Sequence, residues 1–371
     1  MTDYLLTPPD AAEVRVLTRG MVSALRTPEG LTPLQQLLVA TMFHSMTGFE
    51  ADTDNCPPLS ATEFAAALER RNMIFRTRIV QLMLLIAMVV RPLPKAVVTQ
   101  LREYADALGV ADDMIDVVER FADGSLELAS ADFARNGYLA SIGPERLDAL
   151  HTGSLDDSWG QVVDDAELAG RWRSLEELPV GTMGRGVADF YRDRGFVYPG
   201  LPGSAPPLLA QHDWVHVLAG YGTALESELE VFGFMARAND DPRAFSLLAM
   251  VVSLFETGYL AEGAGLFQAN AGHLSTTGMA VRLADAMRRG ALTAGSHDFL
   301  DLDWFSLADR PVTVVRAEIC LPPKAPEATT AGSVGPWQVG GISPFQLHSA
   351  QTAAIGAGRS YTPWTPDPSR E

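Results

Sequence analysis

Apolar residues recur every three or four positions along most of this chain, which is the repeat of an α-helix with one buried face. Residues 31–135 contain successive segments of this kind, separated by short breaks. The breaks lie at Pro57-Pro58, Pro92, Gly109 and Gly124. Ser60 and Glu63 have the spacing of a capping box, which marks the start of a helix. This pattern predicts a compact all-α domain.

A second helical block runs from about Asp165 to Leu321, with a Pro- and Gly-rich insert at residues 199–207. Between the blocks the repeat weakens, which predicts a domain boundary near residue 150. After Pro322 the composition is rich in Pro, Gly, Ser, Thr and Ala without a repeat, as in disordered chains. We expect metal binding to survive removal of this tail. The predicted organisation is all-α: an acidic helical accessory domain at residues 1–150, a metal-binding helical bundle at residues 160–322 and a disordered tail at residues 323–371.

Composition limits the partners and the location of the protein. With 46 acidic and 28 basic residues the formal charge is −18, whereas nucleic-acid binding needs clustered positive charge. Cys56 and Cys320 are far apart in sequence, which favours free thiols in a reducing compartment. The longest apolar run, Ile79–Val90, is shorter than the roughly 20 residues that span a bilayer, so we expect a buried helix there. We predict a cytoplasmic protein without a signal peptide, with peripheral contact to the inner face of the membrane as an option.

Residues with metal-binding chemistry are concentrated in the stretch Gln211–Phe234. His212 and His216 are four positions apart, so on a helix they differ by about 40° and share one face. This separation allows two imidazoles to chelate one ion, and Asp213 is adjacent. Glu228 comes twelve residues later, where an unbroken helix would place it about 18 Å further along the axis.

The sequence GYGT at residues 220–223 changes that outcome, because its two glycines favour a helix end and Thr223 is available to cap the next helix. Two helices that meet at this corner bring Glu228 back over the histidines. The result is an open site suited to zinc or ferrous iron. From the residues alone, a His pair at this spacing is equally typical of structural or exposed histidines, and both readings stay open.

The same stretch resembles the coenzyme Q biosynthesis protein 4 family, whose signature is HDxxH, eleven residues and then Glu. Every position of the signature is matched, by His212, Asp213, His216 and Glu228. The lead-in LEELPVGTMGRGVADFYRDRG at residues 175–195 and the break HVLAGYGT are also similar to the family. In the closing segment DLDWFSLADRPVTVVRAEICLPP the matching residues are Trp304, Pro311, Arg316 and Glu318. The resemblance covers about residues 165–323.

This resemblance implies an all-α fold with a divalent metal, zinc first and iron second, held by the four signature residues. It implies a role in ubiquinone assembly, described both as organisation of the biosynthetic enzymes on the membrane and as oxidative decarboxylation at ring carbon C1 of a prenylated hydroxybenzoate. The chain departs from the family in its N-terminal domain, its tail and the surface around the closing Trp. The N-terminal block is loosely similar to tellurite-resistance B-like domains, with an anonymous helical accessory domain as the alternative.

Two function hypotheses follow. The first is a metal-dependent lyase or oxidative decarboxylase that acts at a ring carbon of a prenylated hydroxybenzoate-like substrate, with Asp213 as a proton-transfer candidate. The second is a non-catalytic prenyl-lipid-binding scaffold for quinone-biosynthesis enzymes with a structural zinc. Four protein ligands would favour the structural role and an open position would favour chemistry. The expected partners are a prenylated aromatic or isoprenoid lipid, quinone-biosynthesis enzymes and further copies of this chain, but no nucleic acid.

Further candidate binding residues lie in the predicted second domain. The stretch SLFETGYLAEGAGLFQANAGHL alternates small glycines with apolar residues and predicts either a groove for an apolar tail or a close helix–helix contact. Glu256, Glu262 and His273 lie in it. Phe232, Phe234 and Met235 are candidates for a pocket wall or for ordinary core. The substrate-binding candidates are Tyr221, Phe232, Glu262 and Gly263.

Overall fold

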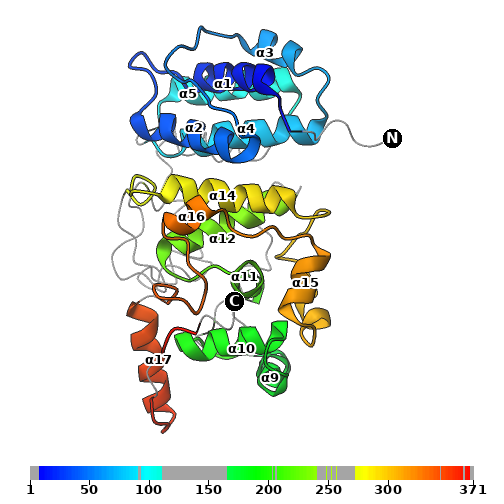
Figure 1. Ribbon diagram of the computed structural model, residues 1–371, viewed down its shortest axis with the longest axis vertical. Coiled ribbons are helices and arrows are strands. Elements are labelled where there is room, and N and C mark those ends of the chain that lie inside the picture. The colour runs from blue at the N-terminus through cyan, green and yellow to red at the C-terminus, as the bar shows by residue number, and fades with distance from the viewer. Residues whose placement is uncertain are drawn as a thin grey trace.

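The computed structural model describes residues 8–90, 93–110, 165–202, 204, 207–239, 248, 252, 256, 272–342, 344–361 and 364–367. Within these residues all regular secondary structure is helical (Figure 1). The two β-bridges there, Thr27–Gly30 and Thr182–Pro311, are isolated. The prediction of an all-α fold is therefore confirmed. No helix in the described ranges has the length and apolar character needed to cross a membrane.

The N-terminal group comprises α1 (Ala11–Leu25), α2 (Pro33–Thr47), α3 (Ala61–Ala67), α4 (Met73–Ala87) and α5 (Lys95–Leu108). The predicted capping box is present, with Ser60 and Glu63 bonded to each other's backbone at the start of α3. The longest apolar run lies mainly in α4, where every residue from Ile79 to Ala87 is buried. A helix with buried residues on all sides belongs to the centre of a core. The run is thus a buried helix, as predicted.

The C-terminal group comprises α9 (Ala166–Ser174), α10 (Met183–Arg194), α11 (Pro207–Ala219), α12 (Leu225–Ala238), α14 (Met279–Leu292), α15 (Val312–Glu318), α16 (Pro326–Thr330) and α17 (Pro344–Gly356). Short 3₁₀ turns occupy Leu175–Glu177 and Trp304–Leu307. In Figure 1, α14 lies between the N-terminal group and the rest, and it packs against α2 on one side and α12 on the other. The buried apolar side chains of both groups form one contiguous cluster. The domain boundary predicted near residue 150 lies outside the described residues.

Composition predicts disorder for residues 323–371, and this prediction is wrong for the part that the structure describes. The C-terminal segment, residues 323–367, contains α16, which packs against α14, and α17, which packs against α10. Trp337 and Gln346 are buried, with 4% and 1% of their surface exposed. Single anchors of this kind and backbone hydrogen bonds hold the segment. Such contacts leave no hydrophobic repeat for a sequence pattern to detect.

Both cysteines are free, as predicted. Cys56 is buried and Cys320 is exposed. Neither contributes to the site described next.

Candidate metal centre

The predicted helix break between the histidines and Glu228 is present. Gly220 ends α11 in the left-handed conformation, with φ of 74°, which glycine adopts at low cost. The backbone N–H groups of Gly220 and Tyr221 both donate to the carbonyl of His216, at 3.0 and 3.1 Å. The chain then turns through the corner, residues 220–223, into α12. This turn brings two short helices together where one long helix would have separated the ligands.

The predicted cap of α12 by Thr223 is wrong. Ala224 is the N-cap residue, and no side chain caps the helix. The Thr223 hydroxyl instead donates to Gln346 Oε1 at 2.5 Å and accepts from Arg194 Nε at 2.8 Å. It is therefore engaged with distant segments, because a buried hydroxyl bonds whichever partners the tertiary fold supplies.

The corner returns Glu228 to the two histidines. Glu228 Oε2 lies 3.2 Å from His216 Nε2 and 3.6 Å from His212 Nε2. Each of the three residues offers one ligand atom within 4.8 Å of the others, and all three are buried. Two ligands at about 2.0–2.1 Å from a tetrahedral zinc lie about 3.4 Å apart. The observed separations fit that geometry.

Two atoms of this cluster have no hydrogen-bond partner although they are buried: His216 Nε2 and Glu228 Oε2. Leaving a buried polar atom unpaired costs about 1–3 kcal/mol, so two that face each other need an explanation. His216 Nδ1 lies 2.9 Å from the carbonyl of Gly222. Because a carbonyl can only accept, Nδ1 carries a proton, so the neutral ring, which is the metal-binding form, presents the lone pair of Nε2 towards Glu228. A cation at this point would satisfy both atoms.

The charge state of Glu228 suits a metal ligand. Burial by itself raises the pKa of this carboxyl, but in the metal-free protein positive charge on the His216 and His212 imidazoles outweighs burial and holds the pKa at about 2. The side chain is therefore a carboxylate at neutral pH, the form in which it can bind a metal.

Asp213, the fourth signature residue, lies beside this three-residue set. Its Oδ1 is 3.6 Å from His212 Nε2, and its Oδ2 accepts a 2.5 Å hydrogen bond from the Tyr191 hydroxyl. Burial raises the pKa of Asp213, and the neighbouring imidazoles only partly counter this. Burial and the Asp213 carboxyl also raise the pKa of Tyr191, so the phenol keeps its proton. The structure therefore pairs Asp213 with a donor on another helix.

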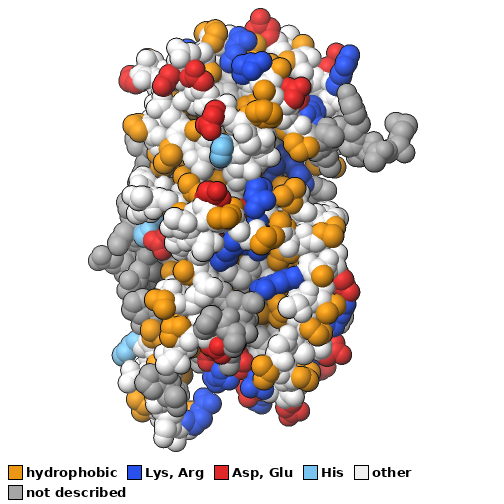
Figure 2. All heavy atoms as spheres, viewed as in Figure 1, with side chains coloured by type: hydrophobic (Ala, Val, Ile, Leu, Met, Phe, Trp, Pro, Cys, Tyr) orange, Lys and Arg blue, Asp and Glu red, His pale blue; other side chains and the backbone are white. Residues whose placement is uncertain are grey.

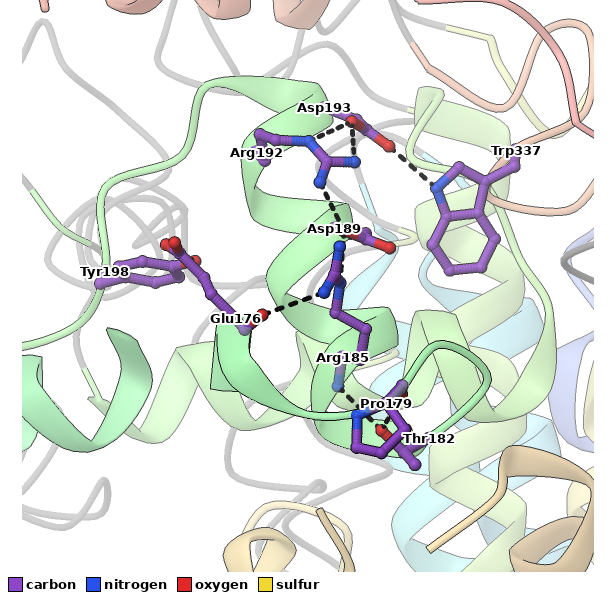
Figure 3. Close-up of polar contacts among 9 residues, drawn as sticks. All are labelled: Glu176, Pro179, Thr182, Arg185, Asp189, Arg192, Asp193, Tyr198 and Trp337. Carbon is purple, nitrogen blue, oxygen red and sulfur yellow. Dashed lines mark hydrogen bonds and ion pairs between the residues drawn. The ribbon is translucent and has the colours of Figure 1, made fainter. Parts of the chain in front are cut away.

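Ion pairs within α10 link successive turns of the helix that carries Tyr191 (Figure 3). Asp189 Oδ1 accepts from Arg185 Nε at 3.0 Å and from Arg192 Nη1 at 2.5 Å. A second contact comes from far along the chain, where the Trp337 indole N–H donates to Asp193 at 3.1 Å. The indole contact connects α10 to the C-terminal segment, while Tyr191 bonds Asp213.

The closing segment of the family resemblance packs against α11. Trp304 stacks on Trp214 of α11, with ring centroids 5.7 Å apart and planes 12° apart. Arg316 donates to the carbonyls of Leu218 and Val217, at 2.7 and 3.2 Å. These carbonyls belong to the last turn of α11, where no helical N–H remains to bond them. The closing segment thus supports the helix that carries both histidines.

The C-terminal segment holds the corner from the other side. Gly222 N–H donates to the Val334 carbonyl at 3.0 Å, and Thr223 N–H donates to the Gly341 carbonyl at 2.8 Å. Arg194, which is fully buried, donates to the carbonyls of Pro336 and Gly341, at 2.8 and 3.0 Å. The carbonyl that orients His216 is therefore in a residue that the C-terminal segment fixes.

Sequence reasoning missed Tyr191, Arg194 and Gln346. Tyr191 is 22 residues from Asp213, and Gln346 is 123 residues from Thr223. No local spacing connects residues so distant, so only the tertiary fold identifies these contacts. Tyr191 and Arg194 do lie within the family-like lead-in at residues 175–195, which is the one signal that singled out this helix.

The remaining candidates divide into three kinds. Phe232 stacks on the His212 ring, with centroids 5.4 Å apart, and so contacts the ligand set. Tyr221 is fully buried and faces the Arg289 guanidinium, 5.0 Å from its ring centre. Glu262 and Gly263 lie outside the described residues, as does most of the predicted groove.

Glu256 and His273, also from the predicted groove, have local structural contacts. Glu256 accepts hydrogen bonds from the Leu274 backbone N–H at 2.9 Å and from the Ser275 hydroxyl at 2.8 Å. His273 Nδ1 lies 3.3 Å from Glu226 Oε1. Neither residue joins the three-residue ligand set.

Comparison with known proteins adds little to this geometry. No family model matches the chain, and no curated protein matches it. One solved structure, from Nostoc punctiforme and described as a "putative ubiquinone biosynthesis protein", is 17% identical over 67% of this chain and 97% of that chain. Its TM-score is 0.29. A likeness this remote carries no argument about the function of this protein.

Proposed function

We propose that this chain is a metal-dependent enzyme whose ion is held by His212, His216 and Glu228, with zinc as the first choice and iron as the second. The observation that carries the proposal is the pair of buried atoms without hydrogen bonds, His216 Nε2 and Glu228 Oε2, which face each other at 3.2 Å. Three protein ligands leave one tetrahedral position open, as in catalytic zinc sites.

Asp213 and Tyr191 supply the proton-transfer groups of this proposal. When bound, the ion acts as a Lewis acid that polarises an oxygen of the substrate. Burial raises the pKa of Asp213, which favours uptake of a proton by this carboxyl relative to an exposed aspartate. Because the Tyr191 hydroxyl occupies Oδ2, Oδ1 on the His212 side is the oxygen that exchanges the proton.

The proposed substrate is a prenylated hydroxybenzoate-like ring, with decarboxylation or another lyase step at a ring carbon. This part rests on the resemblance of the HDxxH stretch and its flanks. It is supported by the aromatic rings beside the ligands, since Phe190 lies 5.2 Å from the His216 ring and Phe232 stacks on His212. Ring-shaped substrates pack well against such walls.

We place the prenyl chain in a cavity of about 360 Å³ that Tyr191 also lines. Helix α17 and the turn after α10 supply most of its other apolar walls: Phe196, Val197, Ala350, Ala353, Ala354 and Trp364. Its size falls in the usual range for sites that bind organic ligands, roughly 300–1,000 Å³. Tyr191 both lines this cavity and donates a hydrogen bond to Asp213.

The second candidate is a scaffold that presents a prenyl lipid to quinone-biosynthesis enzymes and uses the ion structurally. Peripheral membrane contact and self-association belong to this candidate. The burial of the ligands favours it, since His216 is 0% and Glu228 2% exposed. A structural ion is shielded from solvent, whereas a catalytic ion must be reached by substrate.

The two candidates differ in whether the fourth coordination position of the ion is free to bind a further ligand. We would load the protein with Co²⁺, add azide and record the visible absorption spectrum. The enzyme proposal expects azide to change the spectrum, because a free position accepts it, and a closed structural site leaves the spectrum unchanged. A His212→Ala, His216→Ala double variant that retains the full metal content would refute the metal site itself.

The reaction has its own test. Protein carrying its metal is incubated under air with a prenylated hydroxybenzoate labelled at the carboxyl carbon, and labelled CO₂ is collected. Release that is lost in Asp213→Asn, with the metal retained, supports the enzyme. Absence of release from protein with a full metal content and an azide response would exclude decarboxylation of this ring.

A further inference from the structure

The last turn of α11, which carries His216, ends in carbonyl groups that have no N–H partner within the helix. Arg316 of α15 bonds two of these carbonyls. The next one, that of Ala219, accepts a hydrogen bond from Arg289 Nη2 at 3.0 Å. Arg289 belongs to α14 and follows Ala219 by 70 residues, so the contact exists only in the folded chain.

Arg289 also contacts the residues on both sides of this carbonyl in the fold. Its Nε donates to the carbonyl of Pro322, immediately before the C-terminal segment, at 2.9 Å. Its guanidinium lies 5.0 Å from the centre of the Tyr221 ring, within the range of a cation–π interaction. One side chain therefore connects the end of α11, the corner at residues 220–223 and the chain that leads into the C-terminal segment.

Arg289 differs from the basic residues at the surface. On the face shown in Figure 2, Lys and Arg side chains gather between the two groups of helices, at the level of α14 in Figure 1. Only 4% of Arg289 is exposed. Water competes little for the hydrogen bonds of a buried guanidinium, and the low local dielectric strengthens them. These contacts therefore constrain the backbone more than surface contacts would.

The constrained backbone faces the imidazole of His216. The carbonyls of Tyr221 and Gly222 lie 3.3 and 2.9 Å from His216 Nδ1. The acceptor on one ring nitrogen sets the orientation of a metal-binding imidazole. If these carbonyls move, the ring follows, and Nε2 no longer points at Glu228 Oε2, 3.2 Å away.

We infer that Arg289 is a positioning residue of the metal centre, which fixes Ala219 and Tyr221 and thereby orients the His216 ring. The inference rests on the proposed function, because the orientation of Nε2 matters only if it is a ligand. Arg289 is outside the three-residue ligand set and acts through the carbonyls. Arginine suits this role, since its planar fork bonds two carbonyls while its face lies on a ring.

The test observes His216 in the full-length protein with nitrogen-15-labelled histidine. NMR detects the Nδ1–H proton, because a buried, hydrogen-bonded proton exchanges slowly with water, and His216→Gln identifies its signal. We expect this signal to shift or disappear in Arg289→Gln, with or without zinc. Zinc affinity, measured by competition with a chromophoric chelator, should fall about tenfold, at the lower end of the effect of outer-shell substitutions.

Two further variants separate positioning from general stability. Arg71→Gln is the matched control, because Arg71 is a largely buried arginine of the N-terminal group that bonds Glu13 and lies over the Phe75 ring. It should leave the His216 signal and the zinc affinity unchanged. Arg289→Lys keeps the charge but has a single nitrogen, which cannot replace both carbonyl contacts. It should bind zinc more weakly than the wild type.

A wild-type His216 signal and zinc affinity in folded Arg289→Gln would overturn the inference. If that variant does not fold, the same result in Arg289→Lys would overturn it. An equal loss of zinc in Arg71→Gln would also do so, since instability alone would explain the effect. Tighter zinc binding without the guanidinium would show that Arg289 acts only as a repelling charge. Wild-type protein that takes up no zinc would instead refute the proposed function, while the signal of the metal-free protein still tests the orientation of His216.

Discussion

The N-terminal group and the corner at residues 220–223 are held by different kinds of contact. Apolar burial dominates the N-terminal group, where every residue of α4 from Ile79 to Ala87 is buried. Hydrogen bonds dominate the second, where backbone and side-chain groups of the corner bond residues more than a hundred positions away. Apolar burial sums many small contributions, whereas each buried polar contact has a full penalty when its partner is removed. Fold stability and metal binding should therefore respond to different substitutions.

The largest expected effect comes from deletion of the chain after Pro322. The deletion removes the acceptors of the Gly222 and Thr223 N–H groups and of Arg194. Each buried donor left unpaired costs about 1–3 kcal/mol. We expect loss of metal, measured by elemental analysis, with the helical signal in far-UV circular dichroism largely kept by the N-terminal group. This reverses the expectation from composition, that the tail is dispensable for metal binding.

Deletion of residues 368–371 is the matched control for that experiment, and it should leave the metal content unchanged. A chain that ends at Pro322, stays folded and still holds a full complement of metal would show that the C-terminal segment does not support the corner.

The next largest effect concerns the stability of the N-terminal group. Leu85 is fully buried in α4, and Leu85→Ala should lower the free energy of unfolding by about 2–5 kcal/mol through loss of burial and creation of a cavity. Urea denaturation measures the change, and the metal content should stay that of the wild type. Leu37→Ala, at a position 46% exposed on α2, should change stability by less than about 0.5 kcal/mol. Loss of metal in folded Leu85→Ala would mean that the two regions are not separable.

A smaller effect is expected at the contact between α10 and α11. Tyr191→Phe leaves Asp213 Oδ2 without the donor at 2.5 Å, at a cost of about 1–3 kcal/mol in unfolding free energy. The metal should remain, because Tyr191 is not a ligand. The control is Tyr198→Phe, whose hydroxyl bonds the exposed Glu176 carboxylate at 2.8 Å and should matter less. Equal destabilisation by both variants would argue that the Asp213 contact has no special weight.

The smallest effect tests the local sequence signal. Ser60→Ala removes half of the capping box at α3 and should cost about 1 kcal/mol. Ser174→Ala, where the hydroxyl bonds an exposed carbonyl at the end of α9, is the comparison. A cost for Ser60→Ala no greater than that for Ser174→Ala would show that this cap adds nothing to the N-terminal group.

The sequence predicts best where structure is decided locally. The apolar run at Ile79–Val90, the box at Ser60 and Glu63, and the break at Gly220 depend on spacing or backbone preference within a few residues. The return of Glu228 to the histidines followed from the break, because two helices joined by a tight turn lie close together. These features need no knowledge of the rest of the chain.

The sequence predictions fail where contacts between distant segments determine the structure. Thr223 has the right identity for a helix cap, but it lies one residue before the N-cap Ala224, and its hydroxyl bonds Arg194 and Gln346 instead. Tyr191 reaches Asp213 from another helix. The C-terminal segment has the composition of a disordered chain, yet Trp337 and the carbonyls of its loops find partners on α10 and at the corner. A hydrophobic pattern records burial, and it records nothing about backbone acceptors.

The close approach of Gly222 and Gly341 has a consequence for how the protein is made. A Cβ added to Gly222 would lie 2.6 Å from the Cα of Gly341. Two backbone segments therefore lie against each other here, each with a glycine at the contact. Gly341 follows Thr223 by 118 residues, which a ribosome takes roughly 6 to 24 s to add at about 5–20 residues per second. For nearly all of that interval the histidines and Glu228 already exist, but the segment that bonds the backbone of Gly222 and Thr223 does not. The site therefore becomes complete only after Gly341 has been made, and an ion that binds earlier meets ligands that are not yet fixed in place.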